Sequence, residues 1–470
     1  MEQIEEMLKK PPKKYRPLVR WWWPGLDVTE EELVREIKDL DEHGFGGAEI
    51  QSFLIGTPSP NTELKHRFAP HPAYYQMVER VLREAKARDM IIDLTISSSW
   101  PPGGTWVAEE DSLRTLMMGT DIIKGPTHVE MKVPKPKINA FYKLQGFLKK
   151  LLGSFITKFD ETKFKPIRTV AVHPIKKSKK LHFIRPTATP LDAKSAMDIS
   201  KHVDEKGWLS WDVPAGDWQI FTIYAGPSFM KPLSDAKSDP EAKSLVVDMF
   251  NQEALERFFK GHLETDDALE LLKPYYGNTL RALFTDSQEI GSEWFWTGDF
   301  FEEFEKRRGY DVRPFLPVCF VPNRDNQFTH VVFANEKPCF DFPDSIGERI
   351  RYDWELTISD LFTERYCGGI AKLARAHGLQ HRIQTYGIRA DLLKAYGQAD
   401  IPETEQLFAG GALDFLKLAG SAGALYGKQI VSSESFVWRN RDYMTTPFKI
   451  KVAADKLFVA GINQVIYHGH

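Results

Sequence analysis

Two glutamates in this sequence follow apolar segments in a way that suits acid–base chemistry. Glu289 closes the stretch FTDSQE, and Glu434 lies in the centre of SSESF. Hydrolysis of a glycosidic bond needs such a pair, because one carboxylic acid protonates the leaving oxygen while a carboxylate acts as base or nucleophile. Either glutamate alone is equally well explained as a structural partner of a cation such as Arg281 or Arg382. The two together, beside many aromatic residues, favour the catalytic interpretation.

Tryptophans are concentrated near the start of the chain, in RPLVRWWWPG (16–25). Successive residues of a strand face opposite sides, so three tryptophans in a row predict that at least one faces a pocket. Aromatic faces stack on the apolar faces of sugar rings, and five tryptophans fall at predicted strand ends or in the loops beyond them. These candidates are Trp22, Trp100, Trp106, Trp294 and Trp296. Core packing is the alternative for each one.

Polar residues recur at every second position in several apolar segments. Asp93, Thr95 and Ser97 alternate with apolar neighbours, which places them on one face of a strand. A polar face inside a fold is costly unless it binds something polar. The same alternation predicts substrate contacts for Glu49, Gln51, Asp93, Arg382, Gln384, Tyr386 and Glu403. His468 is a further candidate, or a buried histidine with a backbone partner.

The elements that position these residues alternate between strands and helices. Eight short strand segments are predicted, at 18–23, 46–53, 90–100, 280–290, 380–387, 400–408, 428–438 and 463–470. Strands that alternate with helices indicate an α/β protein with a parallel sheet. A (β/α)₈ TIM-type barrel is the favoured architecture, and a doubly wound sheet is the alternative. Polar residues at the C-terminal strand ends favour the barrel, because barrel active sites lie there.

The βα alternation is interrupted between strands three and four. Residues 106–250 show β segments separated by lysine-rich and proline-containing stretches, which predict an inserted β-sandwich module. The first part of the barrel is then 1–105, and the second part is 251–470. An apolar stretch at 141–159 inside the module has the composition of a helix.

Composition excludes several classes of protein. The 470 residues are 42% hydrophobic and 27% charged, which is typical of a globular fold. A net charge of −3 gives no basic footprint for nucleic acid. No apolar run approaches the length of a membrane span, and the N-terminal residues lack a signal-peptide h-region. We therefore expect a cytoplasmic protein, or a periplasmic or extracellular one if a leader was removed.

Several motifs together resemble the catalytic region of glycoside hydrolase family 106, known for α-L-rhamnosidases. The motifs are RPLVRWWWPG, TEEELVREI, GFGGAEIQSF, FTDSQEIG with RRGYDVRPFLP, WDVPAGDW, SSESF and the closing YHG. The resemblance spans most of the chain. It implies a (β/α)₈ catalytic domain, removal of terminal α-L-rhamnosyl residues from glycans or glycosides, an inverting mechanism and a calcium ion near the sugar hydroxyls.

Site roles follow from the same resemblance. Glu289 matches the position of the general acid, and Glu434 matches that of the general base. We expect an apolar setting beside Trp294 and Phe295 to keep Glu289 protonated. Glu405 is the candidate calcium ligand because Glu403 and Glu405 form the densest carboxylate pair at a strand end, and hydrogen bonding to sugar hydroxyls is the favoured alternative for this pair.

The sequence ends at His470, at the tip of the eighth predicted strand. Members of the family continue through a last helix and further β domains, so we expect a fragment whose C-terminal β domains are missing. An uncovered strand face would then lower solubility or promote association. Two alternative functions remain at this stage: a barrel glycosidase for another sugar, such as a galactoside or glucuronide, and a non-catalytic carbohydrate-binding protein.

Overall fold

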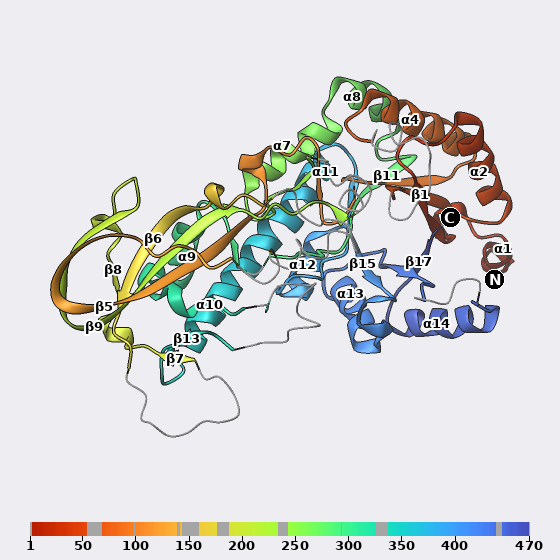
Figure 1. Cartoon of the computed structure of the whole chain (residues 1–470). Helices are drawn as coiled ribbons and strands as arrows, with labels where there is room; N and C mark the ends of the chain where they lie inside the picture. Colours follow the sequence, from red (N-terminus) through yellow and green to blue (C-terminus); the bar gives the residue numbers. More distant parts are fainter. Residues whose placement is uncertain are drawn as a thin grey trace.

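Eight parallel strands close into a barrel at one end of the molecule (Figure 1). The computed structural model describes residues 2–53, 68–97, 99–138, 142, 159–175, 188–233, 243–292, 294–322, 324, 337–438 and 444–469. The barrel strands are β1 (Leu18–Trp23), β2 (Gly47–Ser52), β3 (Ile91–Thr95), β11 (Leu280–Thr285), β14 (Gln380–Ile383), β15 (Ile401–Glu405), β16 (Ser432–Ser435) and β17 (Gln464–His468). Their order around the barrel is β1-β17-β16-β15-β14-β11-β3-β2. All eight predicted strands are present, so the predicted barrel is confirmed.

The three consecutive tryptophans show how a strand of period two divides its side chains. Trp21 and Trp23 are buried and meet edge to face, with ring centroids 5.3 Å apart. The Trp21 indole N–H donates to Glu36 at 2.6 Å, so this ring faces helix α2 (Glu30–Glu42) outside the barrel. Trp22 lies on the opposite face, where its ring contacts His468 at the end of β17. One of the three tryptophans therefore faces the mouth of the barrel.

Helices lie around the barrel and also beside the sheet at the other end of the molecule (Figure 1). Those described after α2 are α4 (Pro72–Ala87), α7 (Gln252–Leu263), α8 (Asp266–Leu272), α9 (Phe300–Arg308), α10 (Ile346–Leu361), α11 (Gly369–Ala376), α12 (Leu392–Gln398), α13 (Leu413–Leu425) and α14 (Pro447–Val459); α1 (Glu2–Lys9) precedes β1. Helix α2 begins at the predicted cap, since Thr29 accepts a hydrogen bond from the Glu32 amide, and it buries Leu33, Ile37 and Leu40. A π-helical turn, Phe362–Gly368, joins α10 and α11 into one long helical region.

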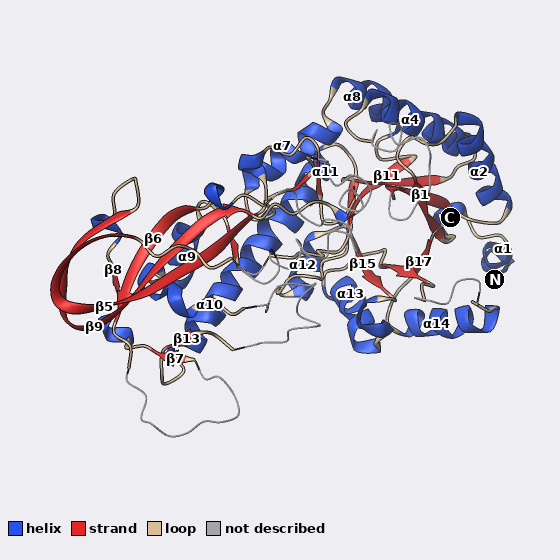
Figure 2. Ribbon diagram, in the orientation of Figure 1, coloured by secondary structure: helices blue, strands red, loops and turns tan. Residues whose placement is uncertain are grey.

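The insertion between β3 and β11 supplies four strands of a five-stranded sheet that extends away from the barrel, and β12, which follows β11 in the chain, supplies the fifth (Figure 2). Its order is β12-β5-β9-β6-β8, with β5 (Arg114–Lys132), β6 (Lys165–Val172), β8 (Met197–Asp198), β9 (Trp208–Pro227) and β12 (Phe295–Trp296). The sheet packs against the turn Arg313–Val318 through β6 and β8. The described residues thus place helical structure against this sheet, and the predicted sandwich is not confirmed. Except for Tyr142 and Phe159, the predicted helix at 141–159 lies outside the described residues.

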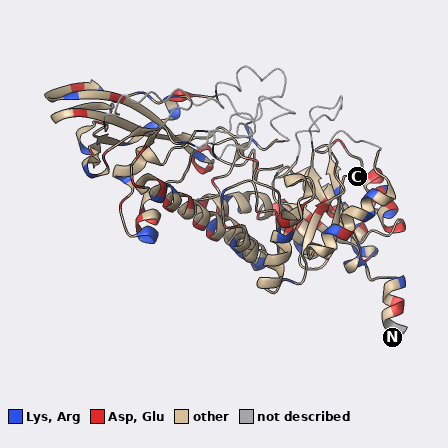
Figure 3. Ribbon diagram, turned by 90° about the horizontal axis from the view of Figure 1, so that it is seen from below, with Lys and Arg blue, Asp and Glu red and all other residues tan. Residues whose placement is uncertain are grey.

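Acidic and basic residues are interspersed along the outer helices (Figure 3). This distribution fits the nearly balanced net charge of −3. In the part of the chain that the structure describes, no helix is both long and apolar enough to cross a bilayer.

Candidate active site

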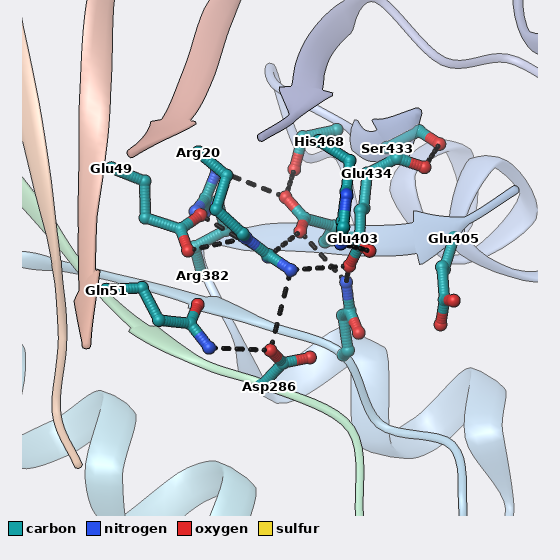
Figure 4. Close-up of polar contacts among 12 residues, drawn as sticks. Arg20, Glu49, Gln51, Asp286, Arg382, Glu403, Glu405, Ser433, Glu434 and His468 are labelled. Carbon is teal, nitrogen blue, oxygen red and sulfur yellow. Dashed lines mark hydrogen bonds and ion pairs between the residues drawn. The ribbon is translucent and has the colours of Figure 1, made fainter. Parts of the chain in front are cut away.

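Arg20 and Glu434 meet inside the barrel near the C-terminal ends of the strands (Figure 4). Arg20 lies on β1, and its Nη1 is 2.6 Å from Oε2 of Glu434 on β16. The same Glu434 oxygen accepts a hydrogen bond from Gln384 Nε2 at 2.9 Å. Its other oxygen lies 3.3 Å from Nε2 of His468. Glu434 is 5% exposed, so this carboxylate is enclosed yet reaches the surface of the site.

Below this pair, charged side chains fill the barrel interior. Glu49 accepts a hydrogen bond from Arg20 Nε at 2.8 Å and also forms an ion pair with Arg382. Arg382 contacts Glu403 at 3.2 Å. Nearer the N-terminal strand ends, Asp93 pairs with Arg281 at 2.6 Å. The side chains of Glu49, Asp93, Arg382 and Glu403 have 0% exposed area, so they offer a sugar no accessible atom. The predicted substrate contacts of these four residues are therefore wrong for this structure. The four side chains lie beneath the site and support the residues above them.

Carboxylates outnumber cations in this interior. Among the described residues, six buried carboxyl groups, those of Glu49, Asp93, Asp286, Glu403, Glu405 and Glu434, face three guanidinium groups, those of Arg20, Arg281 and Arg382. Burial raises the pKa of Glu49 to about 7 and that of Asp286 to about 6, although Arg20 opposes both shifts. Burial, with the surplus negative charge adding to it, thus keeps part of this cluster protonated near neutral pH.

The pKa of Glu405 is raised further than that of Glu49 or Asp286. Burial raises its pKa to about 9, and the charges of Glu434, Asp286 and Glu289 add to this effect, while the Tyr386 hydroxyl opposes it. Tyr386 donates to Glu405 Oε2 at 2.7 Å. Glu405 is consequently a neutral acid at pH 7.

Glu434 shows the opposite behaviour. Burial opposes its ionisation, but the charges of Arg20 and His468 and hydrogen bonds from Gln384 and Arg20 lower its pKa overall. Burial also lowers the pKa of His468, which leaves Arg20 as the permanent positive charge beside this carboxylate. Glu434 is therefore ionised in a group of carboxyls that are held partly protonated.

An aromatic rim lies at the mouth of the barrel. Trp100 and Phe53 are stacked, with an interplanar angle of 8° and centroids 6.3 Å apart, and Trp22 lies 6.2 Å from Trp100. All three rings are half-buried. The Trp100 indole N–H donates to Glu289 Oε1 at 3.2 Å. The structure thus brings the predicted stacking residues Trp22 and Trp100 together beside the predicted acid.

The other three tryptophan candidates belong to the core. Trp106 stacks on Phe258 and donates to its carbonyl oxygen. Trp294 is 2% exposed and packs on Trp354, and Trp296 is 8% exposed. The prediction that these three rings stack on a sugar is therefore wrong. The expected apolar partners of Glu289 also change, because Trp294 lies in this core and Trp100 contacts the carboxyl group instead.

The remaining predicted contacts converge on the cluster. Gln51 donates to Asp286 at 3.2 Å, Gln384 bridges Glu434 and Glu403, and Tyr386 reaches Glu405. Gln51, Gln384 and Tyr386 are at most 2% exposed, so they too support the site from below and do not reach a sugar in this structure.

Sequence reasoning missed Arg20 and Asp286 as site residues. Both had a signal in the pattern. Arg20 stands two positions before Trp22 on the same strand, and therefore on the same face. Asp286 lies three residues before Glu289 in FTDSQE. Phe53, at the end of β2, was also missed as part of the aromatic rim.

The carboxyl groups of the cluster suit a calcium ion in charge, but their arrangement does not form a metal site. Surplus carboxylates suit a divalent cation. Glu403 already accepts hydrogen bonds from Ser432 and Gln384 and pairs with Arg382. No group of three or more histidine, cysteine, aspartate or glutamate side chains within the described ranges could hold a metal ion. The metal role of Glu405 stays a prediction.

Comparisons with known proteins match this architecture. The profile of glycoside hydrolase family 106, described as alpha-L-rhamnosidase, matches residues 9–160 and 171–470. A Formosa agariphila protein, provisionally named a beta-glucuronidase, is 24% identical over 479 residues, which cover 99% of this chain and 38% of that protein. The rhamnosidase structure from Novosphingobium sp. PP1Y superposes with a TM-score of 0.69 at 19% identity, over 99% of this chain and 56% of that one. The chain thus spans about two fifths of the length of the first relative and somewhat over half of the second. It belongs to glycoside hydrolase family 106.

Proposed function

We propose that this chain hydrolyses terminal α-L-rhamnosyl residues, with Glu434 as general base and Glu289 as general acid. The observation that carries the proposal is that Glu434, ionised beside Arg20, shares one barrel mouth with Glu289, which is held by Trp100. Family membership supports the sugar and the reaction class. The provisional name of the Formosa relative keeps β-glucuronides as the competing substrate.

The placement of the two carboxyl groups suits inversion. Inverting hydrolases need the acid and the base on opposite faces of the sugar ring, with room for water between them. Glu289 follows β11 and reaches Trp100 beyond the neighbouring β3, whereas Glu434 is on β16, three strands from β11 around the eight-stranded ring. Glu405, by contrast, is the direct register partner of Glu434 on the adjacent strand. A sugar between Glu289 and Glu434 therefore has an acid on one side and a water-activating base on the other.

Each residue then has a defined task. Glu289 delivers a proton to the glycosidic oxygen, and Glu434 removes a proton from the attacking water. Trp22 and Trp100 offer ring faces to the sugar.

The test compares Glu289→Gln, Glu405→Gln and Glu434→Gln on α-L-rhamnosides with good and poor leaving groups. Loss of the acid is tolerated when the leaving group needs no proton, whereas loss of the base is not. We expect Glu289→Gln to retain activity on 2,4-dinitrophenyl rhamnoside and to lose it on an alkyl rhamnoside. Glu434→Gln should lose both, and rescue by azide with an inverted product would support its role as base.

Three results would contradict parts of this proposal. Leaving-group dependence in Glu405→Gln, and its absence in Glu289→Gln, would move the acid to Glu405. Hydrolysis of β-D-glucuronides alone would change the substrate. Binding of rhamnosides by the folded chain without turnover of any glycoside would leave the carbohydrate-binding alternative.

A further inference from the structure

Arg20 contacts two carboxyl groups of the site through one nitrogen atom. Its Nη1 lies 2.6 Å from Glu434 Oε2 and 3.5 Å from Asp286 Oδ2. The residue is 1% exposed. Because the attraction between charges rises as the distance falls and as water is excluded, Arg20 favours ionisation of Glu434 over that of Asp286.

The guanidinium group is fixed in this orientation. Its Nε donates to Glu49 at 2.8 Å, and Nη2 approaches the other Glu49 oxygen at 3.4 Å. Nη2 also lies 3.5 Å from Glu403. The rings of Phe284 and Trp22 flank the group, with centroids 4.7 Å and 5.5 Å from Cζ. A planar fork held at three sides cannot turn away from Glu434, whereas the single ammonium of a lysine could.

The surroundings of Glu434 would otherwise favour its neutral form. The titratable and charged groups that face it are Arg20 on β1, His468 on β17, Glu405 on β15, Asp286 after β11 and Tyr386 after β14. Arg20 is the permanent cation in this set, while Glu405 and Asp286 are carboxyl groups that repel a second negative charge.

We propose that Arg20 is a positioning residue that keeps Glu434, rather than Asp286, as the ionised, water-activating carboxylate at the mouth of the barrel. This inference rests on the proposed function for its catalytic consequence. The protonation state of Glu434, by contrast, can be measured without turnover.

The kinetic test uses Arg20→Gln and Arg20→Lys in the full chain. A base must be ionised, so activity falls below its pKa, and loss of the cation moves this acid limb to higher pH. We expect the acid limb of kcat/KM in Arg20→Gln to move up by about one pH unit or more, which costs about tenfold in kcat/KM on that limb. Arg20→Lys should lie between this variant and the parent chain.

Arg281→Gln provides the matched control. Arg281 also pairs with a fully buried carboxylate, Asp93 at 2.6 Å, but near the N-terminal ends of the strands. Removing either arginine takes the nearest cation away from a buried carboxyl group and destabilises the fold. Thermal unfolding measures this shared cost, and only Arg20→Gln should move the acid limb.

A spectroscopic titration separates this inference from the proposed function. The infrared carboxyl band that disappears in Glu434→Gln reports the protonation of Glu434 in the parent chain and, by the same subtraction, in Arg20→Gln. We expect the band to titrate at higher pH in Arg20→Gln even if no glycoside is hydrolysed. Titration of Glu434 at the same pH with and without Arg20 would overturn the inference, whatever the activity.

Discussion

The indole N–H of Trp100 donates a hydrogen bond to Oε1 of Glu289 at 3.2 Å. Trp100 also stacks on Phe53 at the barrel mouth. One side chain therefore serves the aromatic rim and orients the carboxyl group that we propose as the acid. The two roles of Trp100 can be tested separately, because Trp100→Phe keeps an aromatic ring for stacking and removes the N–H that orients Glu289.

Trp100→Phe should lower kcat by about tenfold to a hundredfold, because a hydrogen bond to a charged or reacting group contributes about 1.5–3 kcal/mol. The loss should be larger for poor leaving groups than for good ones. Steady-state kinetics on the two leaving-group classes measures it. Trp106→Phe is the control, because its N–H bonds the Phe258 carbonyl oxygen away from the site. An equal loss in both variants would contradict the role of Trp100.

Trp22→Leu should raise KM for a rhamnoside more than it lowers kcat. The ring is half-buried at the mouth, and an aromatic face contributes about 0.5–1.5 kcal/mol beyond its buried area, or about twofold to tenfold. Trp21→Phe tests the neighbouring position, where the ring faces α2 and its N–H bonds Glu36. That variant should lose stability in urea and keep its KM. Unchanged KM in Trp22→Leu would remove this ring from the substrate site.

Glu405 should make the fold less stable at alkaline pH. Its pKa is raised to about 9 in the folded chain, so the stability it contributes is present below pH 4.5 and is lost as the pH rises through about 9. Urea midpoints of the parent chain and Glu405→Gln, measured with a chelator present, should diverge between pH 5 and pH 9. At pH 9 the free energy of unfolding of Glu405→Gln should exceed that of the parent chain by a few kcal/mol, relative to the difference at pH 5. A constant difference across this range would show that Glu405 is ionised throughout.

Calcium should raise the unfolding temperature if Glu405 binds it, since a ligand that binds only the folded state stabilises it in proportion to the logarithm of its concentration. We expect a rise with millimolar calcium, its reversal by a chelator, and no rise in Glu405→Gln. Calorimetry measures this effect without substrate. An equal rise in both chains would place calcium elsewhere, and no rise in the parent chain would leave the predicted cofactor without support in the free protein.

Gly47→Ala should disrupt the barrel where β2 meets β3. A Cβ atom at this position would overlap the backbone carbonyl of Ile91. Backbone overlap in a buried sheet cannot be relieved by a rotamer change, so we expect a loss of more than about 2 kcal/mol or failure to fold. Gly298→Ala is the control, because no atom lies within 4 Å of an added Cβ there. Equal circular dichroism melts for the two variants would contradict the close strand pairing.

The barrel could be predicted because its information is local. Each strand carries a period of two, and each helix carries a cap or an apolar face, as in Thr29 followed by Leu33, Ile37 and Leu40. The insertion was predicted less well. Its β segments were visible, but whether the sheet meets a second sheet or helices depends on contacts between distant segments, such as β6 with Arg313–Val318.

The sequence by itself determined the family and the two candidate carboxyl groups, because ordered motifs and strand ends are one-dimensional properties. Only the tertiary structure decided how charge is divided among those groups. Arg20 and Glu434 are 414 residues apart in the chain, yet barrel closure brings their side chains to 2.6 Å. Trp22 and Trp106 have the same residue type, yet one reaches the mouth and the other packs on Phe258. Burial and pairing set the protonation state of a carboxyl group, and both arise only when distant strands meet.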